Sequence, residues 1–255
     1  MRRGDWALLA SRDGYRLVVR YMGRRIETIR GFIEAEDLEA AEYGDAVKTS
    51  LGHELYVLRP TLYDISPALK HATQVVYPAD AEFIALVAGI GPGSLVGEAG
   101  TGSGHLTAVL AWRVGPSGLV YTFEKRPEFA EVAWRNLKSL GLEDRVELVV
   151  RDVAASGFGV SGLDAVVLDM GDPWSALPAA LEALKPGGSL VMFSTTVEHA
   201  QKSLAAAYGA GLLDINMAEV SVRRWKAVPG EVRPEGGGPF TGFIIWGKAP
   251  RRGRR

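Results

Sequence analysis

Residues 95–104 constrain the fold of this chain more than any other stretch, because an apolar run passes directly into three glycines at alternate positions. The glycines are Gly100, Gly102 and Gly104. Glycine carries no Cβ, so a loop built in this way lets another molecule lie against bare backbone. The following residues, 105–113, favour a helix. The segment therefore predicts a strand, a ligand-binding loop and a helix, as found in open α/β sheets.

The spacing of the glycines discriminates between cofactors. A dinucleotide fingerprint needs a glycine or alanine three residues after its second glycine, where this chain has His105. Counting from Gly102 and Gly104 places Thr107 there instead, so neither register fits. With Glu98 two residues before the first glycine, the pattern is acidic-x-Gly-x-Gly-x-Gly. This pattern resembles motif I of class I methyltransferases, and the resemblance implies S-adenosylmethionine as the cofactor.

Three carboxylates follow further apolar runs. Glu124 comes about 20 residues after the glycines, where doubly wound sheets hold ribose hydroxyls; as an alternative, it is an acid favoured by a helix dipole. Asp152 follows the run 146–150 and either accepts the amine of an adenine ring or is a solvated loop residue. Asp169 ends the run 165–168. Since parallel strands end at one edge of a sheet, these groups are expected to converge.

The spacing of the runs predicts an α/β fold with two domains. Residues 1–60 hold short β-type runs and turn signals, typical of a small N-terminal β-domain. Residues 61–255 alternate strand and helix, and end with two late strands joined by a long loop. This order fits the Rossmann-like seven-stranded sheet of class I methyltransferases, whose last strand runs antiparallel. The second domain is therefore expected to be the S-adenosylmethionine-dependent methyltransferase domain.

Composition narrows the remaining possibilities. The chain has 255 residues, 47% of them hydrophobic, which is ample for a buried core. It contains no cysteine, which excludes disulfides and zinc–thiolate sites, and its four histidines show no metal-ligand spacing, so no metal is expected. Few Asn, Gln and Cys residues suggest a thermophile, although the many arginines have genome composition as another explanation. No apolar run approaches a membrane span, so a cytoplasmic protein is expected.

Three segments could carry the substrate. In the first, residues 73–80, Pro78 restrains Tyr77, and Asp80 is interpreted as the cap of the next helix. In the second, residues 169–174, Asp172 is expected at the N-cap before Pro173, which leaves Asp169 without a structural duty. The third is a basic stretch with one aromatic that either holds phosphate and stacks bases or forms a solvated edge strand. Its candidate RNA-binding residues are Arg223, Arg224, Trp225 and Arg233.

Taken together, the glycine loop at 98–104, the segment 74–80, the motif 168–174 and the pair Arg223 and Trp225 resemble the tRNA adenine-N1 methyltransferase family that modifies the T-loop, the type called TrmI in archaea and bacteria. The resemblance covers nearly the whole chain, and the motif at 168–174 is its most specific part. It implies methylation of adenine 58 of tRNA, with adenine 57 as a possible second target, and a homotetramer.

The resemblance also implies roles for individual residues. The cofactor would lie along the glycine loop and the first turn of the following helix, be held through its ribose by Glu124 and have its adenine framed by Asp152 and Val153. Asp169 would be the active-site acid and Tyr77 a wall of the pocket for the target base. The loop residues concerned are Gly100, Gly102, Ser103, Gly104, His105 and Leu106.

Two features of the sequence differ from what is expected of this family or of an RNA-binding enzyme. Many members of the family carry His before Thr-x-Phe near the C-terminus, and this chain has Phe240 there, which puts the role of that His in doubt. The formal net charge is only −1, so affinity for RNA must come from the distribution of charge. Arginines gather between Arg16 and Arg30 and in the tail 251–255, and an N-terminal face that contacts tRNA is expected; solvated arginine is the alternative.

Other activities share the same glycine loop. A protein-carboxyl methyltransferase that repairs isoaspartate is one alternative, although the basic run at 223–226 and the motif at 169–174 do not suggest it. A non-catalytic tRNA-binding partner subunit is another, but such a subunit has no reason to keep the glycines together with Glu124 and Asp169. Cofactor binding would separate these possibilities.

Overall fold

The computed structural model describes residues 1–238 and 240–251. The chain divides into two compact units, Met1–Leu69 and Lys70–Arg255. Helix α2 (Leu62–Ile65) and the 3-10 turn η1 (Ser66–Ala68) close the first unit. Thr61 starts α2 with a capping box, in which its side chain and that of Asp64 each accept from the other's backbone N–H.

The first unit is built on a four-stranded antiparallel sheet in the order β2-β1-β6-β5, beside a separate hairpin of β3 and β4. Gly14, at φ 92°, makes the turn between β1 and β2, as the Asp13–Gly14 pair predicts. A short helix, α1 (Ala35–Ala40), buries Leu38 in the core of this unit. The strands are β1 (Trp6–Ala10), β2 (Arg16–Arg20), β3 (Ile26–Thr28), β4 (Gly31–Ile33), β5 (Ala46–Lys48) and β6 (Glu54–Leu58).

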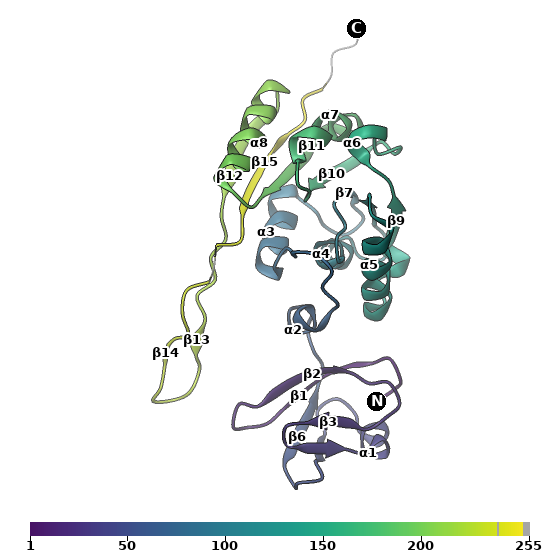
Figure 1. Cartoon of the computed structure of the whole chain (residues 1–255), viewed down its shortest axis with the longest axis vertical. Coiled ribbons are helices and arrows are strands. Elements are labelled where there is room, and N and C mark those ends of the chain that lie inside the picture. Colours follow the sequence, from purple (N-terminus) through teal and green to yellow (C-terminus); the bar gives the residue numbers. More distant parts are fainter. Residues whose placement is uncertain (239, 252–255) are drawn as a thin grey trace. The chain divides into compact units, whose positions relative to one another are not determined.

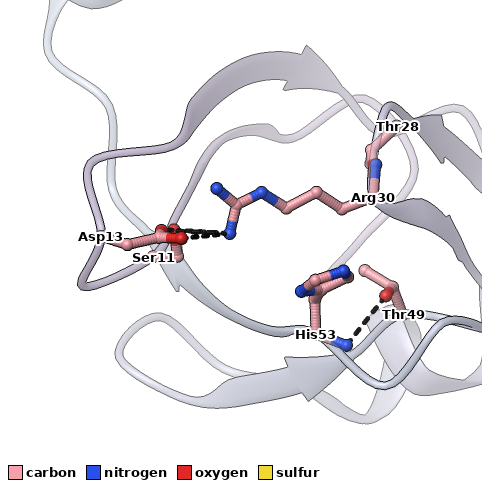
Figure 2. Close-up of polar contacts among 6 residues, drawn as sticks. All are labelled: Ser11, Asp13, Thr28, Arg30, Thr49 and His53. Carbon is pink, nitrogen blue, oxygen red and sulfur yellow. Dashed lines mark hydrogen bonds and ion pairs between the residues drawn. The ribbon is translucent and has the colours of Figure 1, made fainter.

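Arginines of this unit are tied to neighbouring acids and aromatic rings. Figure 2 shows Arg30 reaching to Asp13, with 2.9 Å between the guanidinium and the carboxylate, while the Arg30 backbone N–H donates to Thr28. The same guanidinium lies over the ring of Tyr15, 4.7 Å from its centroid. In the same view the backbone N–H of His53 donates to Thr49. Arg30 is therefore held by local contacts on the surface of its own unit.

The second unit contains a seven-stranded sheet in the order β12-β15-β11-β10-β7-β8-β9. Its strands pair in parallel except β15, which is antiparallel to both neighbours. A seven-stranded sheet whose last strand runs antiparallel is what the sequence predicts. The strands are β7 (Leu95–Ala99), β8 (Leu119–Glu124), β9 (Val146–Val150), β10 (Leu163–Leu168), β11 (Leu184–Ser194), β12 (Leu213–Ala218) and β15 (Phe243–Lys248).

The central strands β7 and β10 are buried almost throughout, because helices cover the sheet. Such strands read as continuous apolar runs rather than alternating ones, which is why the sequence marks them so clearly. The helices are α3 (Pro78–Ala88), α4 (His105–Val114), α5 (Pro127–Leu140), α6 (Val153–Ser156), α7 (Pro173–Ala183) and α8 (Val197–Gly209), with a 3-10 turn, η2 (Glu143–Arg145), before β9.

Of two expectations about helix caps, the one for Asp80 is wrong and the one for Asp172 is confirmed in position. Helix α3 begins at Pro78 with Tyr77 in the N-cap position, so Asp80 lies inside the first turn and does not cap. Proline at the first helical position fixes this start, because its missing N–H needs no partner there. Asp172 does occupy the N-cap position of α7, but its side chain makes no capping hydrogen bond. Both carboxylates are therefore available for other contacts.

A long arm, whose described residues are 219–238 and 240–242, lies between β12 and β15 and extends away from the sheet of its unit (Figure 1). Within it, β13 (Trp225–Lys226) pairs antiparallel with β14 (Arg233–Pro234). The sequence places strands around 213–222 and 240–246, whereas the sheet strands end at 218 and resume at 243. Exposed apolar side chains lie along the arm, namely Val222, Trp225, Val228, Val232 and Phe240.

Candidate active site

A cavity of about 440 Å³ lies in the second unit where the parallel strands end. Strands β7, β8, β9, β10 and β11 all deliver residues to its wall from their carboxyl ends or the loops that follow them. Open α/β sheets bind ligands at this edge. The cavity brings together six of the residues that the sequence singles out: Gly100, Gly102, Glu124, Asp152, Val153 and Asp169.

The glycine loop requires glycine for two separate reasons. Gly100, Gly102 and Gly104 have φ of 96°, 54° and 79°, a region that other residues rarely adopt. In addition, a Cβ on Gly100 would stand 1.7 Å from the backbone oxygen of Asp169. The N–H of Asp169 also donates to Ala99 O at 2.8 Å. Backbone contact at this point fixes the loop against the strand end that carries Asp169.

The other loop residues support the cavity from outside its wall. The Ser103 hydroxyl accepts from the backbone N–H groups of Ala72 and Thr73 at 2.7 and 3.2 Å. It therefore positions the segment 73–76, which lines the cavity. Gly104 packs against α5, where a Cβ would lie 3.2 Å from Ala133. His105 and Leu106, both buried in the first turn of α4, are likewise absent from the lining.

Glu124 holds the glycine loop from the end of β8. Its carboxylate is nearly buried and accepts from the Gly102 N–H at 2.9 Å. The other oxygen accepts from the Arg126 N–H at 3.1 Å and forms an ion pair with the Arg126 guanidinium at 3.4 Å. A carboxylate has about four lone-pair positions, so acceptor capacity remains for hydroxyl groups of a ligand in the cavity.

Two further carboxyl groups close to Glu124 have strongly raised pKa values. Glu98 is fully buried beneath the loop and accepts from the Thr107 hydroxyl at 2.6 Å; burial raises its pKa to about 8, and Asp169 and Glu124 add to the shift. Burial, with a smaller effect of the Glu124 charge, raises the pKa of Asp169 to about 7. Like charges confined together favour the protonated forms. Asp169 can thus exchange a proton near neutral pH.

Asp152 and Val153 form the wall at the end of β9. The Asp152 carboxylate caps α6 by accepting from the Ala154 N–H at 3.0 Å, while its side chain stays exposed. Val153 is buried and packs in the core cluster beneath the cavity. Asp152 therefore caps a helix and still has lone pairs that can accept further hydrogen bonds.

The remaining predicted residues lie outside the cavity wall. Tyr77, in the N-cap position of α3, follows the lining segment 73–76 but is 46% exposed and is not part of the wall. The four basic and aromatic candidates lie on the arm with exposed side chains, namely Arg223, Arg224, Trp225 and Arg233.

The cavity also contains residues that the sequence argument missed. Phe193 and Thr195 come from the end of β11, His199 from the first turn of α8, and Thr241 from the end of the arm. The rule that ligands collect at strand ends would have found the first two, had it been applied to the fifth strand. The ring of His199 packs edge-on against Trp174 of the 169–174 motif, with 5.3 Å between centroids.

The wall suits S-adenosylmethionine. Gly100 and Gly102 leave backbone bare, Glu124 and Asp152 offer acceptors, and the volume falls within the range of small-molecule sites. Within residues 1–238 and 240–251, no three His, Asp or Glu side chains are grouped so as to hold a metal ion. None of the helices in these ranges is long and apolar enough to cross a membrane.

The sheet order and the glycine cavity define a class I methyltransferase. A solved structure from Thermotoga maritima, described as an S-adenosylmethionine-dependent O-methyltransferase, superposes with a TM-score of 0.92 at 34% identity, covering 100% of this chain and 96% of that one. Residues 54–233 match the family model described as the tRNA methyltransferase complex GCD14 subunit. The chain belongs to this family of tRNA methyltransferases.

Curated relatives support the same family. A protein of Methanocaldococcus jannaschii, named tRNA (adenine(57)-N(1)/adenine(58)-N(1))-methyltransferase TrmI, is 31% identical over 96% of this chain and 95% of its own length. The tRNA (adenine(58)-N(1))-methyltransferase TrmI of Thermus thermophilus is 34% identical over 77% of both chains. The resemblance found from sequence motifs is thereby confirmed at the level of the family.

Proposed function

We propose that this chain transfers a methyl group from S-adenosylmethionine to N1 of adenine 58 in the T-loop of tRNA. Family membership supports the substrate class. The observation that carries the chemistry is the position of Asp169: the residue lines the cavity, its backbone abuts Gly100, and the pKa of its carboxyl is raised to about 7.

The residues of the chain act mainly by positioning. When bound, S-adenosylmethionine supplies an electrophilic methyl group, and adenine N1 already carries a lone pair, so no strong base is needed. Glu124 would hold ribose hydroxyls, while Asp152 and Val153 frame the adenine of the cofactor. Holding two reactants in line can supply much of the rate acceleration.

Asp169 would stabilise charge that appears during the transfer. Methylation of N1 spreads positive charge to the exocyclic amine of the target adenine, and a carboxylate accepting that N–H binds the transition state more tightly than the ground state. The backbone contact with Gly100 keeps the acid beside the loop that would hold the cofactor. Tyr77, exposed next to the lining segment, would stack on the target base once it is extruded from the T-loop.

RNA would contact the exposed arm and the first unit. Arg223, Arg224 and Arg233 offer charge on the arm, and Trp225, 52% exposed, offers a stacking surface. In the first unit, Arg12 and Arg59 lie over Tyr56 and Tyr43 at 5.7 and 4.6 Å from the ring centroids, which presents charged and aromatic surface together.

A homotetramer and action on adenine 57 belong to the same proposal. The apolar side chains along the arm would be covered in an assembly of copies, since soluble chains seldom leave such surface open. The protein of Methanocaldococcus jannaschii carries both positions in its name. Light scattering measures the assembly, and base mapping measures the second position.

The proposed activity can be tested by mapping the product. The purified chain is incubated with labelled S-adenosylmethionine and unmodified tRNA transcripts, one normal and one with adenine 58 replaced, and the methylated base is located by mass spectrometry. We expect N1-methyladenine at position 58 that disappears with the replacement. Label remaining at position 57 would show dual specificity.

The alternative functions predict different results. Cofactor binding without methylation of tRNA would favour a protein-carboxyl methyltransferase, which an isoaspartyl peptide assay would then detect. Absence of cofactor binding would favour a non-catalytic tRNA-binding partner subunit. Either result would refute the proposed reaction.

A further inference from the structure

A single hydrogen bond ties the end of the arm to the helix next to the cavity. The Thr241 hydroxyl donates to the Asp80 carboxylate at 3.0 Å, across 161 positions of the chain. Thr241 lines the cavity, whereas Asp80 is 2% exposed in the first turn of α3. Burial raises the pKa of the Asp80 carboxyl, and the hydroxyl acts against that shift. Asp80 does not cap its helix, so this contact gives the buried carboxylate a purpose.

The residue after Thr241 is also packed against the cavity wall. A Cβ on Gly242 would lie 2.5 Å from the ring of Phe193, which lines the cavity. Glycine is therefore needed there for close approach of the backbone to the ring. The chain is thus fixed at two successive positions, by a hydrogen bond at Thr241 and by packing at Gly242.

Beyond these two residues the arm has few anchors. The residues 219–238 and 240 are almost all exposed, and their only strand pairing is the short β13–β14 ladder within the arm. The direction of the arm relative to the cavity is then set where it rejoins the sheet. A small change in the backbone direction at Thr241 would therefore become a larger displacement further along the arm.

We propose that Asp80 is a positioning residue that, by holding the Thr241 hydroxyl, fixes the arm at the rim of the cavity, so that tRNA bound to the arm meets the methyl donor in register. Asp80 acts through Thr241, since Thr241 lines the cavity and Asp80 does not. The kinetic part of this inference rests on the proposed function, but the structural part does not.

The first test compares Thr241→Val with Thr241→Ser under single-turnover conditions, with saturating cofactor and tRNA. Valine keeps the shape and removes the hydroxyl, whereas serine keeps the hydroxyl. We expect Thr241→Val to slow methyl transfer roughly tenfold, the factor for losing one hydrogen bond to a carboxylate. Thr241→Ser, which restores the hydroxyl, should bring the rate back to within about twofold of the wild type.

Asp80→Asn and Glu82→Gln form a matched pair for the acceptor. Both replace a carboxylate by an amide on α3, but the side chain of Glu82 is 44% accessible and pairs with Arg113. Asp80→Asn should reduce the transfer rate, because a neutral amide oxygen is a weaker acceptor. Glu82→Gln should not. Equal rates for all four variants and the wild type would overturn the proposal, as would a loss in Thr241→Ser equal to that in Thr241→Val.

The second test measures the arm directly. The chain has no cysteine, so spin labels can be placed at Val228→Cys on the arm and Tyr208→Cys on α8, both exposed positions. Labelled protein is diluted with unlabelled protein to suppress distances between copies, and the distance distribution is recorded by double electron–electron resonance. Thr241→Val should broaden or shift the distribution, and Thr241→Ser should not; an unchanged distribution refutes the positioning role.

The two tests separate this inference from the proposed function. If the wild-type protein methylates no tRNA, the proposed function fails, yet the distance measurement still decides whether Asp80 and Thr241 hold the arm. If methylation is normal and the distance distribution ignores the hydroxyl, the proposed function stands and the positioning role falls.

Discussion

The charged groups of the first unit and those of the cavity are arranged in opposite ways. In the first unit, arginines meet acids near the surface: Arg16 and Asp64 approach to 2.5 Å, and Arg25 and Glu27 to 2.7 Å. In the cavity, Asp169 lies close enough to Glu124 for the charge of one to raise the pKa of the other. The first unit pairs opposite charges, whereas the cavity, besides the Glu124–Arg126 ion pair, also brings carboxyl groups close to one another.

We interpret the difference as one between surface charges and the carboxyl groups that are proposed to take part in methyl transfer. An exposed ion pair contributes little to stability, because water and salt screen it. A carboxyl group that is withdrawn from water beside another carboxyl group costs free energy, but it gains a pKa suited to neutral pH. The predictions below test this contrast, from the cavity outward.

The largest effect is expected for Asp169→Asn. The amide keeps the shape but has no negative charge, so we expect methyl transfer to slow by about 10²- to 10³-fold, as for other lost electrostatic contacts to a transition state. In the wild type, whose Asp169 has a pKa of about 7, the single-turnover rate should rise with pH to about 7 and then level off. The variant should lack this rise.

Cofactor binding provides the control for Asp169→Asn. Calorimetric titration should give a dissociation constant within a few-fold of the wild type, because the glycine loop and Glu124 are untouched. An unchanged rate would exclude Asp169 as the group that stabilises the transferred charge. A parallel loss of cofactor affinity would assign the residue to binding instead.

A smaller effect, on stability, is expected for Glu98→Gln. Folding raises the pKa of this carboxyl from 4.5 to about 8, so between these pH values the folded chain keeps a proton that the unfolded chain releases. The free energy of unfolding of the wild type therefore falls as pH rises through this window, by on the order of 1 kcal/mol per pH unit, and is flat above it. Glutamine has no proton to hold.

Urea unfolding at pH 5, 6, 7 and 8 measures this contribution. The stability of Glu98→Gln relative to the wild type should increase across the series, and Glu98→Ala should be less stable than Glu98→Gln throughout, because it leaves a void and removes the acceptor of Thr107. Parallel curves for the wild type and Glu98→Gln would mean that the Glu98 pKa is close to its ordinary value.

Many residues of the cavity could be predicted because they belong to short, continuous patterns in the sequence. The strand, the glycines and Glu98 occupy ten consecutive residues, and Glu124 and Asp169 each follow an apolar run directly. Burial on both faces of the sheet forces those runs to be apolar, so the positions of the strand ends can be read without knowledge of the fold.

The features that were not predicted depend on contacts between residues far apart in the sequence, or on how deeply a side chain is buried. The Asp80–Thr241 contact joins residues that no local pattern connects. Asp80 follows Pro78 closely and could have capped a helix starting after it, but α3 already starts at Pro78, and Asp80 is buried in its first turn. The contacts by which Ser103 positions the segment 73–76 and Glu124 holds the glycine loop were not predicted either, since sequence spacing does not show which N–H a side chain will meet.

The smallest effect is expected on the surface of the first unit, for Arg30→Met. Methionine retains an apolar stem that can pack on Tyr15 and removes the ion pair with Asp13. We expect the Tm at pH 7 to change by less than about 2 °C, as for other exposed pairs. The Ser11 hydroxyl and, to a smaller extent, Arg30 lower the pKa of Asp13 to about 2, so the contribution of the charged carboxylate should persist down to pH 4 and vanish as pH falls through 2. A Tm loss of many degrees that survives 1 M NaCl would show that this surface pair is structural, and the contrast between the two regions would then need a different explanation.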